Sequence, residues 1–384
     1  MTRIVILGAG FAGLTLAAEL DTLAAQGKAD VTLVDRAPHF SMGLNLQWVF
    51  AGRRSPQQGE RMYASLRPRH VRFLHDGVVA IDTAKGVVRT RSTSLPYDHL
   101  MLALGAELAP DLVPGLADGA YDLFDLDSVL QFRDAVQRLD GGTLLIAIAA
   151  MPFKCPPAPY EYAFLVDDAL RARGVREKVR LVLTTPEPQP MPVAGKVVGD
   201  AVRAMLAARG IEYLTGHTPK TVDAANRRVA YENGAELEYT LLGAVPPHRA
   251  PKVVRDAGLA DASGFVPVEL GTFRAAVPNV YAVGDVAAIK LPGGGPHPKA
   301  GVFAEAQALA VARRLAAEVL GGEPPAYPGR GTCYVEVGRS EAAPAEIRLL
   351  EEGGPAARIE PPSVKGLEMK RQFESERLER WFGG

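Results

Sequence analysis

The feature that most constrains the fold is a glycine-rich turn between an apolar run and a helical run near the start of the chain. Residues 3–7 (RIVIL) are continuously apolar after Arg3, as in a strand buried on both faces of a parallel sheet. Three glycines follow at the spacing GxGxxG: Gly8, Gly10 and Gly13. A helix is expected over 14–25, and a second strand over 31–34 that ends at Asp35. Together these features predict a dinucleotide-binding βαβ unit.

Each residue of this motif has an expected role. Gly8 allows the tight turn, Gly10 lets the backbone approach a pyrophosphate, and Gly13 permits close packing of the helix on the strand. The helix N-terminus faces the phosphate charge. Asp35 is placed to accept hydrogen bonds from ribose hydroxyls. The alternative is a glycine turn that serves packing alone.

A second α/β unit is expected after a Pro/Gly-rich linker at 109–119. Its predicted elements are a helix over 127–139, a strand over 143–149, a helix over 160–173, a strand over 179–184 and a helix over 195–209. Where a second nucleotide site needs GxGxxG, residues 150–159 (AMPFKCPPAP) hold four prolines. Proline has no N–H to donate to phosphate, so we expect that this unit does not bind NAD(P)H.

Two further strand ends carry small residues. A buried strand is expected over 97–106, and near its end the lack of a side chain at Gly105 lets the backbone approach a cofactor closely. The apolar run 280–283 ends in Gly284 and Asp285. Lys299 then precedes an Ala-rich helix expected over 302–320.

Composition excludes several classes of protein. The 384 residues predict two or three domains, and 47% hydrophobic residues with 23% charged residues are typical of a folded chain. Lys+Arg 43 against Asp+Glu 44 gives no basic field for nucleic acid. The two cysteines belong to no metal-ligand spacing, so no metal is expected. No signal peptide is seen, and the longest apolar run, 144–153, is about half of a membrane span.

The glycine motif with Asp35, the strand end at 102–105 and the run 281–285 (YAVGD) resemble the two-dinucleotide-binding-domain flavoproteins typified by disulfide reductases. Within that superfamily, three features resemble sulfide:quinone oxidoreductases and the flavoprotein subunit of flavocytochrome c sulfide dehydrogenase. These are residues 153–161 (FKCPPAPYE), residues 298–301 (PKAG) and the lone later Cys333. The resemblance covers residues 1 to about 325.

The resemblance implies an α/β fold with two Rossmann-like domains plus a C-terminal segment. The expected divisions are 1–110 for the first part of an FAD-binding domain, 111–250 for the second Rossmann-like domain, 251–325 for the second part of the FAD-binding domain, and 326–384 for an interface or membrane-association segment.

The resemblance also implies that FAD binds in an extended pose. Its pyrophosphate is expected at Gly8, Gly10 and Gly13, its ribose at Asp35 and its adenine at the backbone of Val79. The cofactor is expected to pack beside Gly105, and its ribityl or pyrophosphate region is expected at Gly284 and Asp285. The pyrimidine edge of the flavin is expected at Lys299.

The same resemblance places Cys155 and Cys333 together as a redox disulfide. Attack of sulfide on a disulfide yields a persulfide on one cysteine and releases the other as a thiolate, from which two electrons reach FAD. Glu161 is then the expected base or proton relay. The alternatives are two unrelated buried thiols, and a first-turn glutamate that only complements the helix dipole.

The expected electron acceptor is a quinone. Cytochrome c is the closest alternative, because two cysteines is the count of the flavocytochrome subunits, although those usually carry the signal sequence not seen here. The chain could also be an NAD(P)H-dependent reductase, or a flavin-binding interaction protein without activity. The oligomeric state stays open.

A last helix is expected over 364–382. Met369 and Phe373 share a face, and its apolar end holds Leu378, Trp381 and Phe382. Aromatic residues beside arginines suit a membrane interface, and the mixed charge suits a partner or dimer surface equally well. The chain is therefore expected to be a peripheral membrane protein or cytoplasmic.

Overall fold

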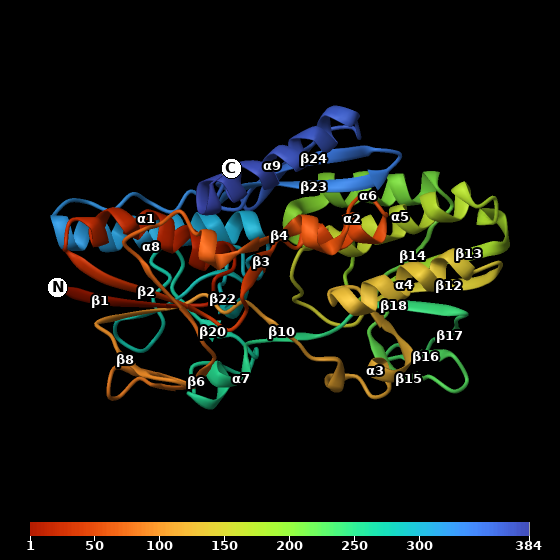
Figure 1. The fold of residues 1–384 in the computed structure, drawn as a ribbon. Helices are drawn as coiled ribbons and strands as arrows, with labels where there is room; N and C mark the ends of the chain where they lie inside the picture. The colour runs from red at the N-terminus through yellow and green to blue at the C-terminus, as the bar shows by residue number, and fades with distance from the viewer. Residues whose placement is uncertain (384) are drawn as a thin grey trace.

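A computed structural model describes residues 1–383, and its first unit is built on a five-stranded sheet whose pairings are all parallel (Figure 1). The strand order is β21 (Val280–Ala282), β9 (His99–Leu102), β1 (Thr2–Leu7), β2 (Ala29–Asp35) and β5 (Arg72–His75). The sequence explains this sheet, because β1, β2 and β9 are runs of apolar residues buried on both faces. Their carboxyl ends meet at one edge, where the glycine turn lies.

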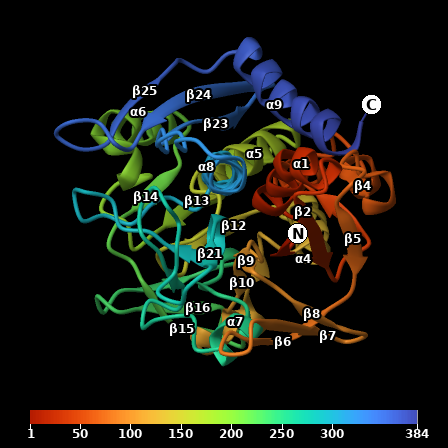
Figure 2. The same cartoon turned by 90° about the vertical axis from the view of Figure 1, so that its left-hand side faces the viewer.

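Two helices cover one face of this sheet. Helix α1 (Phe11–Ala25) and helix α8 (Gly301–Leu320) pack side by side, although some 290 residues of chain separate their starts (Figures 1 and 2). Both begin at the sheet edge that carries the glycine turn, and neither has an acidic residue in its first turn. Two helix N-termini therefore point toward one region, which favours binding of an anion.

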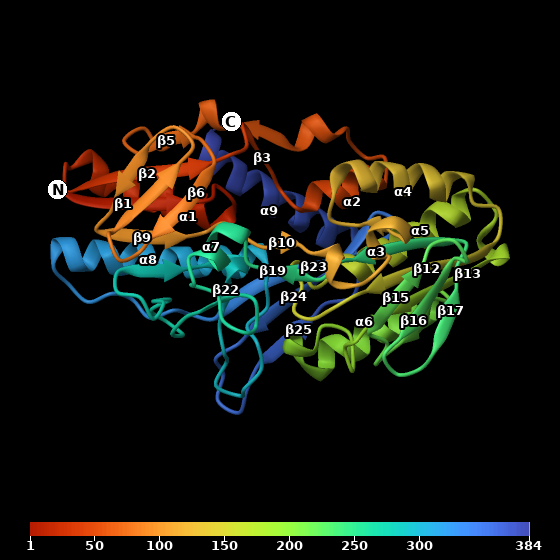
Figure 3. The same cartoon turned by 90° about the horizontal axis from the view of Figure 1, so that it is seen from below.

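The second unit has a five-stranded parallel sheet of its own. The order is β11 (Tyr121–Asp122), β18 (Leu241–Val245), β12 (Gly142–Ile148), β13 (Val179–Thr184) and β14 (Glu212–Leu214). One face packs on α4 (Leu126–Arg138), α5 (Ala158–Ala172) and α6 (Gly195–Ala208). The other face packs on the small sheet β15 (Pro219–Asp223), β16 (Arg228–Tyr231) and β17 (Glu236–Glu238), which Figure 3 shows from below.

Shorter elements connect and cover the two units. They are β3 (His39–Ser41), α2 (Leu44–Phe50), β4 (Glu60–Met62), β6 (Val78–Asp82), β7 (Val87–Thr90), β8 (Ser94–Pro96), β10 (Glu107–Leu108), α3 (Leu116–Gly119), β19 (His248–Arg249), α7 (Lys252–Asp256), β20 (Val266–Pro267) and β22 (Ala287–Ala288). The antiparallel pair of β10 and β19 lies between the two units (Figure 3).

The C-terminal segment lies across both units. An antiparallel sheet of β23 (Arg330–Gly338), β24 (Glu341–Arg348) and β25 (Ala356–Ile359) is followed by α9 (Val364–Phe382). Strand β23 contacts α5 of the second unit and α8 of the first, while α9 contacts α1 (Figure 1). This segment therefore brings residues from both units together over the dinucleotide edge.

The expected use of the apolar end of α9 is wrong. Trp381 is 0% exposed, and its ring contacts the rings of Phe11 and Phe40 with centroids 5.4 and 5.5 Å apart. Leu378 and Phe382 are buried in the same core. These side chains pack inside the molecule, because α1 and β3 offer them an apolar surface, so they do not rest on a membrane or on a partner.

Candidate functional site

The glycine turn has the geometry that a close-approaching phosphate needs. Gly8 has φ +96°, and a Cβ there would lie 2.4 Å from the carbonyl oxygen of Ala103. A Cβ on Gly13 would lie 1.8 Å from the carbonyl oxygen of Gly8, so only glycine lets α1 pack this closely on β1. Gly10, in contrast, has no atom within 4 Å of its Cβ position and borders open space. The backbone is thus exposed to a ligand where the motif predicts it.

A long cleft starts at this turn. Two cavities of about 930 and 570 Å³ both include Gly10 and Gly105 in their walls, so they adjoin each other at this turn. The larger part reaches Asp35 and Val79, and the other part reaches the two cysteines. Gly105 has φ +68° and open space at its Cβ position. The two adjoining cavities together are large enough for an extended dinucleotide.

Asp35 lies at the outer end of the cleft. Its carboxylate accepts hydrogen bonds from the backbone N–H groups of Ala9 (2.7 Å) and Ala37 (2.8 Å). These bonds fix the carboxylate beside the glycine turn, within the wall of the 930 Å³ cavity. A carboxylate oxygen has further lone pairs, so Asp35 can still accept from a ribose hydroxyl.

Asp285 has a buried carboxylate oxygen that no side chain or backbone group of the described residues satisfies. Its Oδ1 is buried and has no hydrogen-bond partner among the described residues, although the side chain lines the 570 Å³ cavity. Burial raises the pKa of this carboxyl, and the charge of Lys299 only partly offsets that effect. Gly284 beside it has φ +75° and donates its N–H to Oε1 of Gln307 (2.7 Å). A ligand hydroxyl in the cleft can supply the donor that Asp285 lacks.

Lys299 connects the cofactor cleft to the cysteine loop. Its ammonium donates to the carbonyl oxygens of Asp285 (2.7 Å) and Ala287 (2.8 Å) and lies 3.6 Å from the ring centre of Phe265. Its own carbonyl accepts from the backbone N–H of Cys155 (2.7 Å). Burial lowers the pKa of Lys299 to about 8. Lys299 thus lines the cavity that holds the cysteines, with its charge directed to two carbonyls.

Cys155 and Cys333 line the same end of the 570 Å³ cavity as free thiols. Cys155 sits in the loop between β12 and α5 with φ +54°, and Cys333 lies within β23. Burial raises the pKa of both thiols, to about 12 for Cys333, and the negative charge of Glu161 adds to both shifts. In these surroundings burial favours the neutral thiol at both positions, so a thiolate at either sulfur needs a nearby cation.

Glu161 lies in the first turn of α5 and is bound on several sides. It accepts from the ammonium of Lys370 in α9 (2.6 Å) and from the backbone N–H of Glu336 in β23 (2.9 Å). The carboxylate of Glu336 also binds Lys370 (3.0 Å), the indole N–H of Trp48 (3.0 Å) and Arg53. Trp48, Glu161, Glu336 and Lys370 are all buried, so this is a charge cluster inside the protein next to the cysteines.

The proton states in this cluster differ by their surroundings. Burial raises the pKa of Glu161, and Lys370 offsets only part of that shift. Burial also opposes the ionised form of Glu336, but the charges of Lys370 and Arg53 outweigh it and lower its pKa. The two carboxylates likewise outweigh burial and raise the pKa of Lys370. Of the two carboxyls, Glu161 is therefore the one whose surroundings favour the protonated form.

The loop before α5 departs from a nucleotide-binding turn. In the first unit three residues (8–10) separate β1 from α1, whereas nine residues (149–157) separate β12 from α5. Two of the last three, Pro156 and Pro157, have no N–H at the start of the helix. The N–H of Ala158, the first residue of α5, donates to the carbonyl oxygen of Cys155 (2.9 Å), so few N–H groups remain for a second pyrophosphate.

Every residue predicted for the site borders this cleft or packs at its glycine edge. Gly10, Gly105, Cys155, Glu161, Gly284, Asp285, Lys299 and Cys333 line one part, while Gly8, Asp35 and Val79 line the other. Sequence reasoning missed Glu336 and Lys370. A charged residue three positions after Cys333 in an apolar strand, and a lysine on the apolar side of the last helix, were the available signals.

The fold and site define a two-domain nucleotide-dependent oxidoreductase. The family described as pyridine nucleotide-disulphide oxidoreductase matches residues 2–308, and the chain belongs to this family. Its members are flavoproteins, and the residues of the cleft fit FAD. Among the described residues, no helix is both long and apolar enough to cross a bilayer, and no group of three or more metal-ligating side chains occurs.

Three individual proteins are similar to this chain in sequence or in structure. The mitochondrial sulfide:quinone oxidoreductase of Dictyostelium discoideum is 27% identical over 303 residues, which cover 74% of this chain and 65% of that relative. An NADH dehydrogenase-like protein of Mycobacterium tuberculosis is 28% identical over 303 residues, covering 76% and 74%. The crystal structure of sulfide:quinone oxidoreductase from Aquifex aeolicus superimposes with a TM-score of 0.86 at 22% identity, covering 98% of this chain and 90% of that one.

Proposed function

We propose that this protein oxidises sulfide at Cys155 and Cys333, with FAD in the adjoining cleft and a quinone as the final acceptor. The observation that carries the proposal is that two cysteines from distant parts of the chain line one end of a cofactor-sized cleft. The relatives named for sulfide oxidation support the same function. FAD, when bound, supplies the acceptor for two electrons.

The cavities suggest different tasks for the two cysteines. Cys155 lines the cofactor cleft, whereas Cys333 lines both this cleft and a second, apolar cavity. In the disulfide state HS⁻ would attack Sγ of Cys333, the bond between the two sulfurs would break, and Cys155 would leave with the electron pair as a thiolate. The sulfide sulfur is oxidised to a persulfide on Cys333, and the electron pair on Cys155 lies on the cofactor side.

Glu161 and Lys370 are proposed to manage the proton and charge of this step. Both lie inside the protein, and the negative charge of Glu161 acts on both thiols. The ammonium of Lys370 acts on Cys155 in the opposite sense and favours its thiolate. A proton taken up by Glu161 would strengthen this bias, because it removes the nearest negative charge.

A quinone fits the rest of the cleft better than a polar acceptor does. The cavity that holds the cysteines is also walled by Phe11, Leu44, Leu46, Tyr334 and Phe373, which come from α1, α2, β23 and α9. Flat apolar molecules bind between such side chains. Because quinones dissolve in membranes, peripheral membrane contact is part of the proposal. It would have to use residues other than the buried end of α9.

NADH is the alternative electron donor, since an NADH dehydrogenase-like relative has a similar sequence identity to this chain. The nine-residue, proline-bearing loop before α5 argues against it, because a nucleotide phosphate finds few N–H donors there. Cytochrome c as the acceptor, and a flavin-binding protein without activity, stay as outcomes of the test.

The test is reduction of the purified yellow protein without oxygen. We expect the flavin absorbance to bleach rapidly after sulfide is mixed with the protein, and to stay unchanged after NADH is mixed with it. A short-chain quinone added next should restore the colour faster than oxidised cytochrome c does. Bleaching by NADH alone would assign the protein to the NADH dehydrogenases. If neither donor bleaches the flavin, the remaining alternative is a flavin-binding interaction protein without activity.

A further inference from the structure

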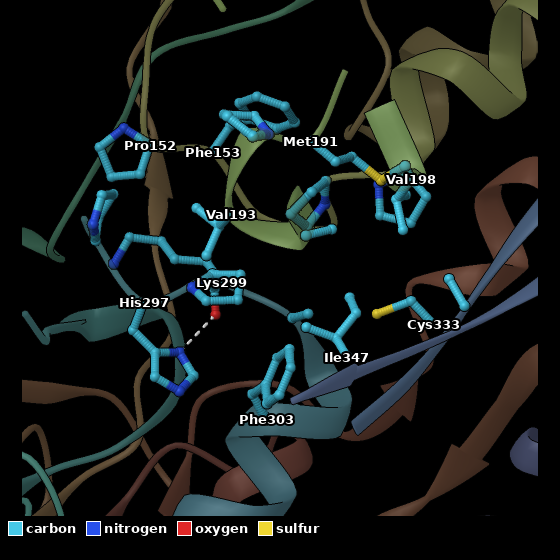
Figure 4. A pocket seen from close by; sticks show the side chains of 18 of the residues that line it. Pro152, Phe153, Met191, Val193, Val198, His297, Lys299, Phe303, Cys333 and Ile347 are labelled. Carbon is cyan, nitrogen blue, oxygen red and sulfur yellow. Dashed lines mark hydrogen bonds between the residues drawn. The ribbon is translucent and has the colours of Figure 1, made fainter. Parts of the chain in front are cut away.

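A second cavity reaches Cys333 from the second Rossmann-like unit (Figure 4). Its volume is about 40 Å³, which holds a molecule of the size of water or hydrogen sulfide but no nucleotide. Its walls are largely apolar and include Phe153, Met191, Val193 and Ile347 together with Cys333. The cavity follows the carboxyl ends of β12 and β13, the place where doubly wound sheets bind their ligands.

One carboxyl group borders this cavity. Glu187 follows β13 by three residues, close to the place that Asp35 takes at the end of β2 in the first unit. Its side chain is 2% exposed. The carboxylate accepts from the hydroxyl of Tyr160 in α5 and from Oγ1 of Thr185 (3.1 Å). It forms no salt bridge with any residue in the range 1–383.

The groups around Glu187 leave it without a counter-charge. Tyr213 of β14 lies beside Tyr160, and Arg203 of α6 faces the ring of Tyr213 at 6.0 Å. On the cavity wall, the ammonium of Lys299 is bound by two carbonyls, and burial lowers the pKa of His297 to about 4. Burial raises the pKa of Glu187 itself to about 7. It therefore gains and loses its proton near neutral pH.

We propose that Glu187 is the base that removes a proton from hydrogen sulfide inside this cavity. This proposal rests on the proposed oxidation of sulfide. Neutral hydrogen sulfide enters an apolar cavity more readily than its anion does. One proton passes to the Glu187 carboxylate, and the HS⁻ so formed bonds to Sγ of Cys333. The bond from Cys333 to Cys155 breaks, and Cys155 keeps the electron pair. The second Rossmann-like unit thus contributes an acidic group to sulfide chemistry in place of nucleotide binding.

The test measures sulfide-driven bleaching of the flavin by rapid mixing from pH 5.5 to 8 in wild type, Glu187→Gln and the control Glu177→Gln, whose side chain is exposed. Comparing rates at each pH cancels the ionisation of sulfide. The rate of Glu187→Gln should equal that of wild type at the acid end. It should become about 100-fold slower above pH 7, the usual worth of a general base. Glu177→Gln should match wild type throughout.

Tyr160→Phe separates a base from a merely structural residue. It removes a hydrogen bond that favours the carboxylate, so the pH at which the rate rises should move upward while the alkaline rate is retained. Bleaching by dithionite confirms that each variant holds flavin. Equal rates for wild type and Glu187→Gln at every pH would overturn the assignment of Glu187 alone. Failure of sulfide to bleach wild type would instead overturn the proposed function.

Discussion

At the scale of single residues, burial without a counter-charge makes Glu187 a pH-sensitive contributor to stability. Its pKa of about 7 in the folded protein lies above the ordinary value of 4.5. The folded state therefore binds more protons than the unfolded state between these pH values, and the free energy of unfolding falls as pH rises. We expect wild type to lose roughly 3 kcal/mol relative to Glu187→Gln between pH 4.5 and 8.

Urea unfolding of both proteins across this range measures the difference. A constant difference between wild type and Glu187→Gln would contradict the buried state of this carboxyl. The exposed Glu177 provides the control, since Glu177→Gln should follow wild type at each pH.

Lys370 tests the buried charge cluster. Its replacement in Lys370→Met leaves the carboxylates of Glu161 and Glu336 with Arg53 as the remaining cation, and we expect a loss of about 3–5 kcal/mol. Adding Glu161→Gln should recover part of that loss, because an uncompensated buried charge is then removed. The exposed Lys365 on the same helix gives the matched control, Lys365→Met. Equal unfolding free energies for the two lysine variants would contradict the cluster.

Some residues of the site could be predicted from the sequence, and others could not. The glycine spacing and Asp35 could be predicted because a local βαβ unit dictates them. Lys370 and Glu161 are 209 positions apart, and no local pattern links them. Glu187 follows a strand as a ribose-binding acid does, but only the tertiary structure shows that Tyr160 and an apolar cavity enclose it.

At the scale of elements, periodicity located the regular segments well. The strand Val179–Thr184 and the helix Val364–Phe382 have the predicted bounds, whereas α1 begins three residues before its predicted start. The glycine motif explains that difference, since the last part of the turn is already helical. Amphipathic pattern alone did not show which surface α9 covers, because an apolar helix face suits a core and a membrane equally.

Trp381 tests the position of α9. Trp381→Ala should lower the free energy of unfolding by about 3–5 kcal/mol, because it empties a site between Phe11 and Phe40. Leu320→Ala, which changes an apolar side chain that is 54% exposed, should cost within about 0.5 kcal/mol. Denaturant unfolding of both variants without lipid measures these two losses. Similar small losses for both would mean that the end of α9 is not part of the core.

At the scale of the whole molecule, the C-terminal segment makes the site. Strand β23 brings Cys333 to the loop of Cys155, and α9 brings Lys370 to Glu161. Each Rossmann-like unit alone has one cysteine or none. The two-unit fold could be predicted from its repeated strand and helix pattern, but the joining of the units over one cleft depends on contacts between residues that are far apart in the chain.

The most direct test of the account is anaerobic mixing of sulfide with the wild-type flavoprotein, Cys155→Ser and Cys333→Ser, followed by absorbance of the flavin. We expect rapid bleaching of wild type and loss of that bleaching in both variants, with dithionite still reducing all three. A sulfide-treated wild type should also carry an extra sulfur atom on the peptide that contains Cys333. Rapid bleaching that persists in either serine variant would contradict the cysteine pair as the site of sulfide oxidation.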